Sequence, residues 1–387
     1  MTLDPNARRY DLDWLRIIAF GLLIFYHVGM FYVTWGWHVK SNYASPSVEP
    51  LMRLVSPWRL ALLFFISGVA VRFATDKAES LGRFASSRLA RLGLPLLFGI
   101  YVWVMLQAYY QVSQSGEFAG SIITFYPDYV ALKQTFSMIT PTWNHLWYLA
   151  YVLVYILLSL AVLPWLKRVP ESRIWQAVST RPLVIVFVLI LPFVGTETWL
   201  SPIFPTTHDL INDWANHAHR FMIFLIGFFA AKDARFWDSV ARVWKFAPIL
   251  AILAWLVLQN GKDVSDWSGQ FLSGTSQRFL FSYMAILYAW SCILILLGFS
   301  QRFLNRKSPL LRYLTGAIFC YYVLHQTITV VAGYYLTEYR LGVAVESALV
   351  LAITVAGCVL GYELIRRIPK VGILFGVHEV SGFRSGR

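Results

Sequence analysis

The chain has 387 residues, of which 58% are hydrophobic and 14% charged, and its 33 Lys and Arg outnumber its 20 Asp and Glu to give a net charge of +13. This composition weighs against a pair of soluble domains, because soluble proteins are about 25% charged. It predicts an all-α, polytopic integral membrane protein that forms one transmembrane domain over residues 1–387, with short cytoplasmic tails at 1–13 and 366–387.

Ten apolar runs are long enough to be candidate membrane spans, and the second, sixth and seventh are short. In chain order they occupy residues 14–34, 57–73, 92–112, 146–166, 183–199, 214–231, 246–259, 279–300, 313–336 and 341–365. We therefore expect about ten transmembrane helices, with the N- and C-termini on the same side of the membrane.

Basic residues set the expected orientation of these spans. If the N-terminus is cytoplasmic, the segments on the inner side hold most of the Lys and Arg residues at every crossing. This bias predicts that both termini are cytoplasmic. It also explains the net positive charge through topology and anionic lipid, so we expect the lipid bilayer rather than nucleic acid as a partner.

Two histidines occupy positions where polar side chains are costly. His27 lies in the first run and His325 about twelve residues into the ninth, so both fall at a similar predicted depth. Arg16 precedes His27 by eleven residues, which brings both side chains to one helix face, about 16 Å apart along the axis. A neutral imidazole at this depth is a suitable proton acceptor for an alcohol substrate.

Three further roles stay open for the two histidines at this point. Each can be a hydrogen-bonded core residue, and two imidazoles at equal depth have the geometry to bind a haem, although no other sequence feature supports haem. Intramembrane His and Glu residues also form relays in proton-coupled transporters, and Glu346 and Glu363 are available for such a relay.

The outer segment HDLINDWANHAHR holds a second polar group, with His208, Asp209, Asp213, His217 and His219. Two histidines one residue apart resemble part of a zinc site, but on a helix they point about 200° apart. We therefore expect no metal site, and a polar outer rim that meets a glycan.

A basic group precedes the third run. Arg88 and Arg91 are three residues apart and lie on one side of a helix, and Arg72 ends the second run. Ordinary inner-loop basic residues explain this pattern, whereas two forked guanidiniums also suit a clamp for a phosphorylated cytoplasmic substrate. Ser67 and Gly68, within the second run, allow a ligand or a second helix to approach closely.

These features, in this order, resemble the acyltransferase-3 family of integral membrane acyltransferases. The resemblance rests on the Arg16 and His27 pattern, on the Arg-x-x-Arg pattern of Arg88 and Arg91, and on YDLDWLR, TWGWHVKSNYASPS, FFISG, RLARLGLP, HLWYL, YYVLHQ and YELIRRIP. It is closest to the branch of osmoregulated periplasmic glucan succinyltransferases, OpgC or MdoC. Residues 167–307 match this branch mainly by hydropathy.

The resemblance implies a multi-pass acyltransferase of the bacterial inner membrane with no permanently bound cofactor. The donor would be cytoplasmic acyl-CoA, expected to be succinyl-CoA, and the acceptor a periplasmic glucan. O-acetylation of another surface glycan is the alternative. The expected catalytic residues are His27 as general base, with Arg16, Asp13 and His325. The expected acyl-CoA contacts are Arg88, Arg91, Arg72 and Ser67.

Overall fold

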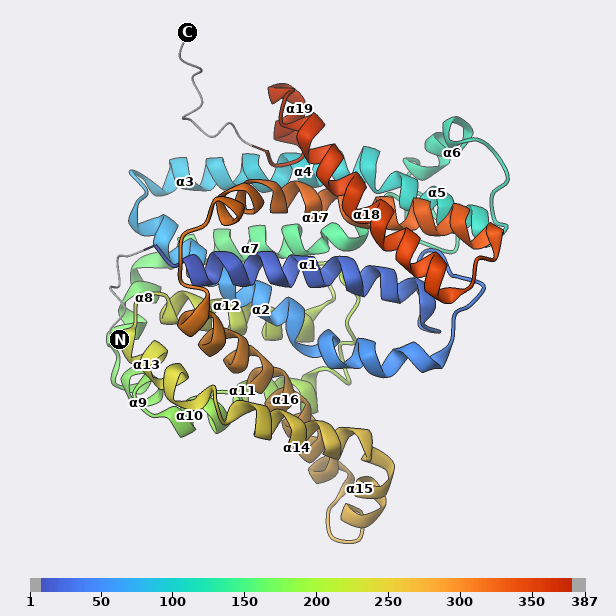
Figure 1. Ribbon diagram of the computed structural model, residues 1–387. Coiled ribbons are helices and arrows are strands. Elements are labelled where there is room, and N and C mark those ends of the chain that lie inside the picture. The colour runs from blue at the N-terminus through green and yellow to red at the C-terminus, as the bar shows by residue number, and fades with distance from the viewer. Residues whose placement is uncertain (1–7, 378–387) are drawn as a thin grey trace. The chain divides into compact units, whose positions relative to one another are not determined.

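The computed structural model describes residues 8–377 (Figure 1). Residues 1–7 and 378–387, which belong to the two predicted cytoplasmic tails, lie outside the described residues. Throughout the described part the regular elements are helices, and no strand forms there. The predicted all-α fold is therefore confirmed.

The N-terminal half of the chain contains long helices interrupted by short 3-10 and π turns. Its elements are α1 (Tyr10–Tyr32), η1 (Pro46–Val48), α2 (Glu49–Asp76), α3 (Leu81–Arg88), η2 (Leu89–Gly93), α4 (Leu94–Phe98), η3 (Gly99–Trp103), α5 (Met105–Gln114), α6 (Ile122–Tyr129), η4 (Asn144–Leu146), α7 (Trp147–Ala161), α8 (Leu163–Arg168), η5 (Val169–Glu171) and α9 (Arg173–Ser179).

The C-terminal half begins with short helices and ends with three long ones. Its elements are α10 (Pro182–Phe187), α11 (Leu191–Gly195), η6 (Thr196–Leu200), α12 (Trp214–Ala230), α13 (Ala234–Val243), α14 (Ala247–Gln259), α15 (Gly261–Ser268), α16 (Gly274–Phe303), α17 (Pro309–Leu336), η7 (Thr337–Tyr339), α18 (Val343–Ile365) and α19 (Pro369–Leu374).

Eight helical stretches in the described residues are long and apolar enough to cross a membrane, so the chain is a multi-pass membrane protein. A ninth is added if α13 and α14, which meet at a bend of 67°, form one span. The predicted span at 214–231 folds as α12, whose 17 residues fall short of the usual length of about 20. The count of ten and the cytoplasmic side of both termini stay predictions.

Two spanning helices begin 11 residues before the apolar runs that predicted them. The second covers Pro46–Asp76 rather than 57–73, because Pro57 lies inside α2, and spanning helices tolerate internal proline. The third covers Leu81–Gln114 rather than 92–112. The helix thus runs through Arg88 and Arg91, which the sequence placed on one helix side just before the third run.

The Leu81–Gln114 stretch contains two π turns, η2 and η3. A π turn changes the hydrogen-bond ladder of a helix, and such turns are frequent at functional sites. Around η3, the Ile100 carbonyl accepts from the Tyr129 hydroxyl at 2.6 Å, and the Trp103 carbonyl accepts from the Thr327 hydroxyl at 3.2 Å. The second π turn therefore presents main-chain oxygens to neighbouring side chains.

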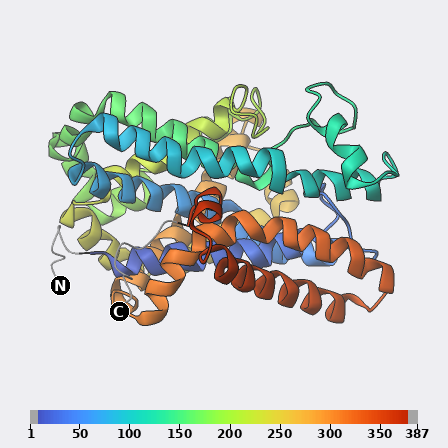
Figure 2. The ribbon, with the colours of Figure 1, turned by 90° about the horizontal axis from the view of Figure 1, so that it is seen from above.

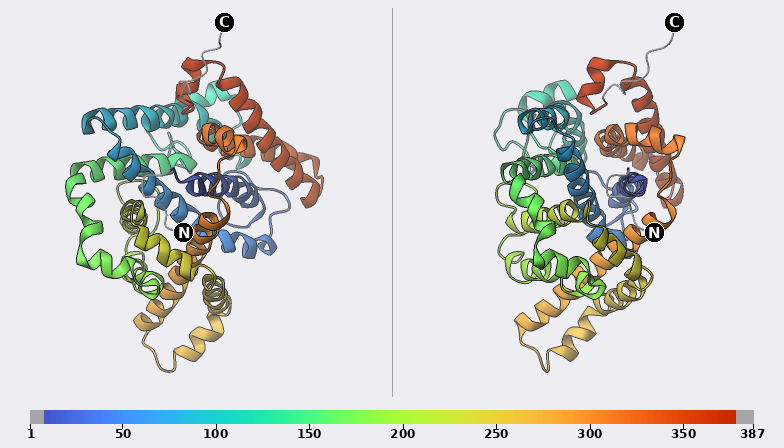
Figure 3. Two further views of the ribbon diagram at one scale, coloured as in Figure 1. Left: turned by 60° about the vertical axis from the view of Figure 1, so that its left-hand side comes forward. Right: turned by 90° about the vertical axis from the view of Figure 1, so that its left-hand side faces the viewer.

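The described chain folds into two compact units built from interleaved segments. Within the described residues, the first unit consists of 8–19, 56–85 and 154–308, and the second of 20–55, 86–153 and 309–377. In the first unit α14 and α16 lie side by side, connected through α15 (Figure 3). In the second unit α17 packs along α18 (Figure 2) and also against α5. That the whole chain is one domain stays a prediction.

Two glycines bring α2 and α12 into close contact in the first unit. A side chain at Gly68 would meet the backbone of Phe224, and a side chain at Gly227 would meet the backbone of Phe65. Small residues permit such close packing between spanning helices. Gly68 therefore serves helix packing, the second of the two roles that its sequence position suggested.

We expect Gly68→Ala to destabilise the protein by about 1 to 3 kcal/mol, because the Phe224 backbone cannot yield to the added methyl group. Gly21→Ala is the matched control, since among the described residues nothing lies within 4 Å of a Cβ added there. In α1 that change should be neutral or stabilising, by up to about 1 kcal/mol. Thermal unfolding in detergent measures both variants, and equal midpoints would contradict the packing argument.

Candidate functional site

His27 of α1 and His325 of α17 meet inside the second unit. Nδ1 of His27 lies 2.8 Å from Nε2 of His325. The two ring planes differ by only 7°, with centroids 4.9 Å apart, which is the geometry of a hydrogen bond within one common plane. Two residues that are 298 positions apart in sequence thus form one hydrogen-bonded pair.

Backbone carbonyls of α17 determine where the hydrogens of this pair reside. Nδ1 of His325 lies 2.8 Å from the Tyr322 oxygen and 3.2 Å from the Tyr321 oxygen. Because a carbonyl only accepts, neutral His325 carries its hydrogen on Nδ1 and accepts at Nε2. His27 then donates from Nδ1 and holds its lone pair on Nε2, so Nε2 is its proton-accepting nitrogen.

A third histidine, His145 of η4, is anchored to the same carbonyl. Its Nε2 lies 3.1 Å from the Tyr322 oxygen and 3.3 Å from the Val323 oxygen, so it carries the hydrogen there. The Tyr322 hydroxyl donates in return to the His145 carbonyl. The ring of His145 lies 5.2 Å from that of His325 and 6.4 Å from that of His27, centroid to centroid.

Planar amide side chains form a network next to the histidines. Gln107, which is 0% exposed, donates to the Thr327 hydroxyl at 2.7 Å and accepts from Asn144 and Gln326 at 3.0 Å each. Its nitrogen also lies 3.4 Å from Nδ1 of His145. A buried amide whose oxygen and nitrogen both form hydrogen bonds holds its neighbours in one arrangement. Breaking any of these bonds would leave a buried polar group without a partner.

The loop that follows α1 adds another aromatic ring and another histidine. Trp37 lies beside His27, with centroids 6.3 Å apart and planes 28° apart. His38 accepts from Gln326 at Nε2 over 2.9 Å and donates from Nδ1 to Gln111 over 2.6 Å. The loop therefore joins the amide network to the residues around His27.

Lys40 fastens this loop to the end of α1. Its ammonium group donates to the carbonyls of Met30 and Val33, at 2.7 Å each, and so satisfies oxygens at the helix terminus. Burial lowers the pKa of Lys40 to about 8, and the Glu49 carboxylate opposes this shift. Ser41 adds a further contact through its hydroxyl, which donates to the buried Glu346 at 2.5 Å.

We expect the stability of the protein to fall as the pH drops below 6.5, and His38 to contribute to this fall. Burial lowers the pKa of His38 from 6.5, and the hydrogen bond to Gln111 only partly opposes it. The unfolded chain therefore binds a proton that the folded chain does not, and stability is lost with falling pH. Unfolding temperatures measured between about pH 7 and pH 5 should vary less with pH in His38→Gln. An unchanged pH dependence in that variant would contradict this.

Arg16 and Asp13 lie on α1, before His27 in sequence. Arg16 Nη2 donates to Asp13 Oδ1 at 3.1 Å, and Asp13 Oδ2 accepts from Arg8 Nη2 at 2.9 Å. Arg16 is thus held by Asp13, whose carboxylate it shares with a second arginine.

The four expected acyl-CoA contacts fall in both units. Arg88 is half-buried at the end of α3, and Arg91 is exposed within η2, where the π turn replaces the α-helical spacing that the sequence suggested. The two guanidinium charges interact electrostatically. Arg72 and half-buried Ser67 lie on α2 in the first unit, where Arg72 pairs with Asp76 at 3.0 Å.

The outer polar segment has its own contacts. His217 bonds the Tyr155 hydroxyl at 3.0 Å and the Leu210 carbonyl at 2.8 Å, whereas His219 lies 3.4 Å from Glu197. The two histidines thus face different partners. Over residues 8–377, no three His, Cys, Asp or Glu side chains are grouped so that they can hold a metal ion.

Several residues around the histidine pair were not predicted from the sequence. These are His38, Gln107, Asn144, His145 and Gln326. His38 and His145 lie within TWGWHVKSNYASPS and HLWYL, two segments that carry the family resemblance, so that signal was present. The only sequence signal for Gln107 is its place in an apolar run, where an amide side chain requires a hydrogen-bond partner.

Comparison with known proteins gives one family and a set of relatives. A family model described as an acyltransferase domain matches residues 9–363. The chain is similar to the glucans biosynthesis protein C of Salmonella schwarzengrund (strain CVM19633) and of Salmonella heidelberg (strain SL476). In both cases 21% of residues are identical over 391 residues, covering 97% of this chain and 96% of the relative. No solved structure matches.

Proposed function

The chain belongs to the acyltransferase-3 family, and we propose that it is a membrane O-acyltransferase that moves a succinyl group from cytoplasmic succinyl-CoA to hydroxyls of a periplasmic glucan. The glucan is proposed because the similar proteins are named for glucan biosynthesis. The succinyl group and CoA are proposed from the sequence resemblance alone, and the bacterial inner membrane is the corresponding location.

One observation carries the proposal, namely the hydrogen bond from His27 Nδ1 to His325 Nε2. It holds the His27 ring in the tautomer whose lone pair is on Nε2, the form that a general base requires. His325 does here what a carboxylate does beside a catalytic histidine in other enzymes, since it orients the ring and stabilises the charge that develops on it. A neutral imidazole is a weaker partner than a carboxylate, but its position is fixed by the Tyr322 carbonyl.

The proposed reaction needs no group beyond donor, acceptor and these side chains. His27 Nε2 takes the proton of a glucan hydroxyl while the hydroxyl oxygen forms a bond to the thioester carbon. The carbon–sulfur bond then breaks, and the imidazolium returns the proton to the departing CoA sulfur. The products are an O-acyl ester and CoA thiol, so atoms and charge balance.

The hydrogen-bond pattern also favours transfer over the transporter alternative. His325 and His145 both donate to the Tyr322 carbonyl oxygen, which has no hydrogen to pass on. A relay in a proton-coupled transporter needs groups that both accept and donate. The His27–His325 pair is therefore better suited to local acid–base chemistry than to a continuous proton path.

Purified protein should release CoA thiol from succinyl-CoA only when a glucan acceptor is present, and the glucan should gain the mass of a succinyl group. Thiol detection and mass spectrometry of the glucan measure the two products independently. Acetyl-CoA with the same acceptor tests the O-acetyltransferase alternative. Proton-coupled solute uptake into proteoliposomes without thiol release would contradict the proposal.

A further inference from the structure

Three cationic side chains of the first unit converge on a single carboxylate. Asp76 Oδ1 lies 3.0 Å from Arg72 Nη1 and 2.7 Å from Lys167 Nζ, and its Oδ2 lies 2.7 Å from Lys232 Nζ. Asp76 ends α2, Lys167 lies in α8, and Lys232 follows the end of α12. We call these four residues the Asp76 cluster. It joins the ends of three helices, all on the predicted cytoplasmic side.

The Asp76 cluster carries more positive than negative charge. Three cations share one carboxylate, so the four side chains together have an excess of two positive charges. The exposed fractions of the side chains are 15% for Arg72, 21% for Asp76, 28% for Lys232 and 32% for Lys167. Charges that are mostly withdrawn from water interact more strongly with a counter-ion than charges on an open surface do. The cluster is thus suited to receive an anion.

Aromatic rings hold two of the cations. The Arg72 guanidinium lies 5.5 Å from the centre of the Phe228 ring, and the Lys232 ammonium lies 5.7 Å from that of Phe73. Such cation–π contacts are attractive but neutralise no charge. They help to fix the direction of the two side chains.

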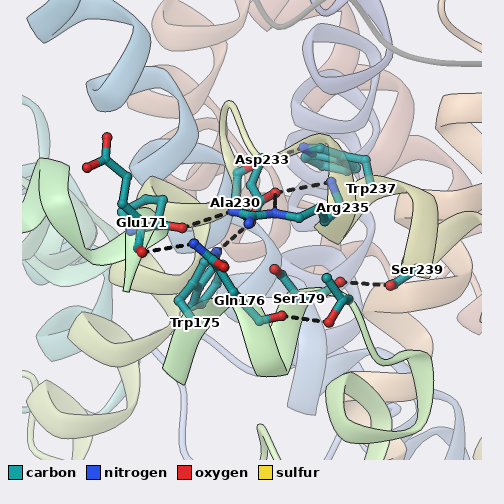
Figure 4. Close-up of polar contacts among 11 residues, drawn as sticks. Glu171, Trp175, Gln176, Ser179, Ala230, Asp233, Arg235, Trp237 and Ser239 are labelled. Atoms are coloured by element: carbon teal, nitrogen blue, oxygen red, sulfur yellow. Dashed lines mark hydrogen bonds and ion pairs between the residues drawn. The ribbon is translucent and has the colours of Figure 1, made fainter. Parts of the chain in front are cut away.

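The turn that carries Lys232 is itself fixed by a hydrogen-bonded group (Figure 4). Asp233, the next residue, accepts from Arg235 Nε at 2.8 Å and from Trp175 Nε1 at 2.7 Å. Arg235 Nη2 also donates to the Pro170 carbonyl at 2.9 Å. Lys232 therefore extends from a rigid turn, and little ordering is required when a ligand binds.

We propose that Arg72, Lys167 and Lys232 bind a phosphate group at the predicted cytoplasmic end of the first unit. A phosphate monoester carries about two negative charges at neutral pH, which matches the excess charge of the cluster. Its oxygens accept charge-assisted hydrogen bonds from guanidinium and ammonium groups. The phosphate belongs either to the headgroup of an anionic lipid or to a soluble nucleotide such as CoA. The nucleotide arm rests on the proposed acyl-CoA donor, for which Arg72 is an expected contact, whereas the lipid arm is independent of acyl transfer.

The test compares two charge-matched double variants. Lys167→Gln with Lys232→Gln removes two cations from the cluster, and Lys245→Gln with Lys307→Gln removes two exposed lysines on the same predicted side. Calorimetric titration with CoA measures the nucleotide arm. Native mass spectrometry after reconstitution with phosphatidylglycerol, or with phosphatidylcholine, measures the lipid arm.

We expect the cluster variant, and not the control, to lose about tenfold or more in affinity in one arm. Weaker CoA binding identifies a nucleotide phosphate, and selective loss of retained phosphatidylglycerol identifies a lipid phosphate. Asp76→Asn should act in the opposite direction and strengthen binding in the same arm, because it raises the excess charge from two to three. If neither arm separates the cluster variant from its control, or if Asp76→Asn weakens binding, the proposal is overturned.

Discussion

His27→Ala should lower acyl transfer by about 10²- to 10⁴-fold, the usual contribution of a general base, while the protein stays folded and inserted. Ser291→Ala is the control, because it removes a buried polar side chain from α16, a spanning helix of the first unit, and leaves the histidines of the second unit unchanged. Thiol release from acyl-CoA in the presence of acceptor measures both variants. Transfer by inserted His27→Ala protein at near the native rate would remove the general-base role.

The partner of His27 allows a sharper form of the same experiment. We infer that His325 acts through His27 as a positioning residue, because it accepts from His27 Nδ1 and donates to the Tyr322 carbonyl. His325→Leu should lower kcat and leave the KM for acyl-CoA unchanged, because the tautomer of His27 is no longer held. His325→Gln should recover part of kcat, since an amide can accept from His27 and donate to the Tyr322 carbonyl. Equal losses in the two variants would indicate a purely structural role.

Replacing both Arg88 and Arg91 with Gln should weaken CoA binding about tenfold or more. Each charge-assisted hydrogen bond to a phosphate contributes about 1.5 to 3 kcal/mol before salt screening reduces it, and about 1.4 kcal/mol is a factor of ten. Lysine at either position should rescue in part, because it keeps the charge but loses the fork. Calorimetric titration of CoA into solubilised protein measures the affinity.

Arg83→Gln is the control for this pair. Arg83 lies on the same helix α3 and its side chain is 80% exposed, so its removal changes the local charge in the same direction. We expect near-native affinity in the control. The same affinity in the Arg88→Gln, Arg91→Gln double variant would mean that the two arginines only set the orientation of the chain in the membrane.

Hydropathy alone was enough to find most of the spanning helices and the two histidines within them, because both depend on local composition. The predicted ends of the apolar runs differ from the helix ends where a helix continues through charged residues or proline, as at Arg88 and Pro57. A hydropathy window treats such residues as the end of a span. The number of spans was harder to predict for a related reason, because the α13–α14 pair bends and α12 is short.

Most of the contacts around the histidines could not be predicted from the sequence. Gln107 and Thr327 are 220 positions apart, and Gln326 and His38 are 288 apart, so no periodicity connects them. The pairing of Arg72 with Lys167 and Lys232 through Asp76 is equally non-local. The sequence suggests Arg72 as an acyl-CoA contact, but only the fold gives it these neighbours.

The carbonyl of Tyr322 has a consequence for how this segment can vary. The atom that orients two imidazoles belongs to the main chain, and every amino acid supplies the same oxygen. Residue 322 can therefore be replaced by another amino acid without loss of this main-chain contact, provided that the helix is retained. A single inserted or deleted residue between Tyr322 and His325 would instead turn the imidazole by about 100° around the helix axis and separate it from both partners. The spacing between residues 322 and 325 in α17 therefore preserves this contact, whereas the Tyr322 side chain contributes separately through its hydrogen bond to the His145 carbonyl.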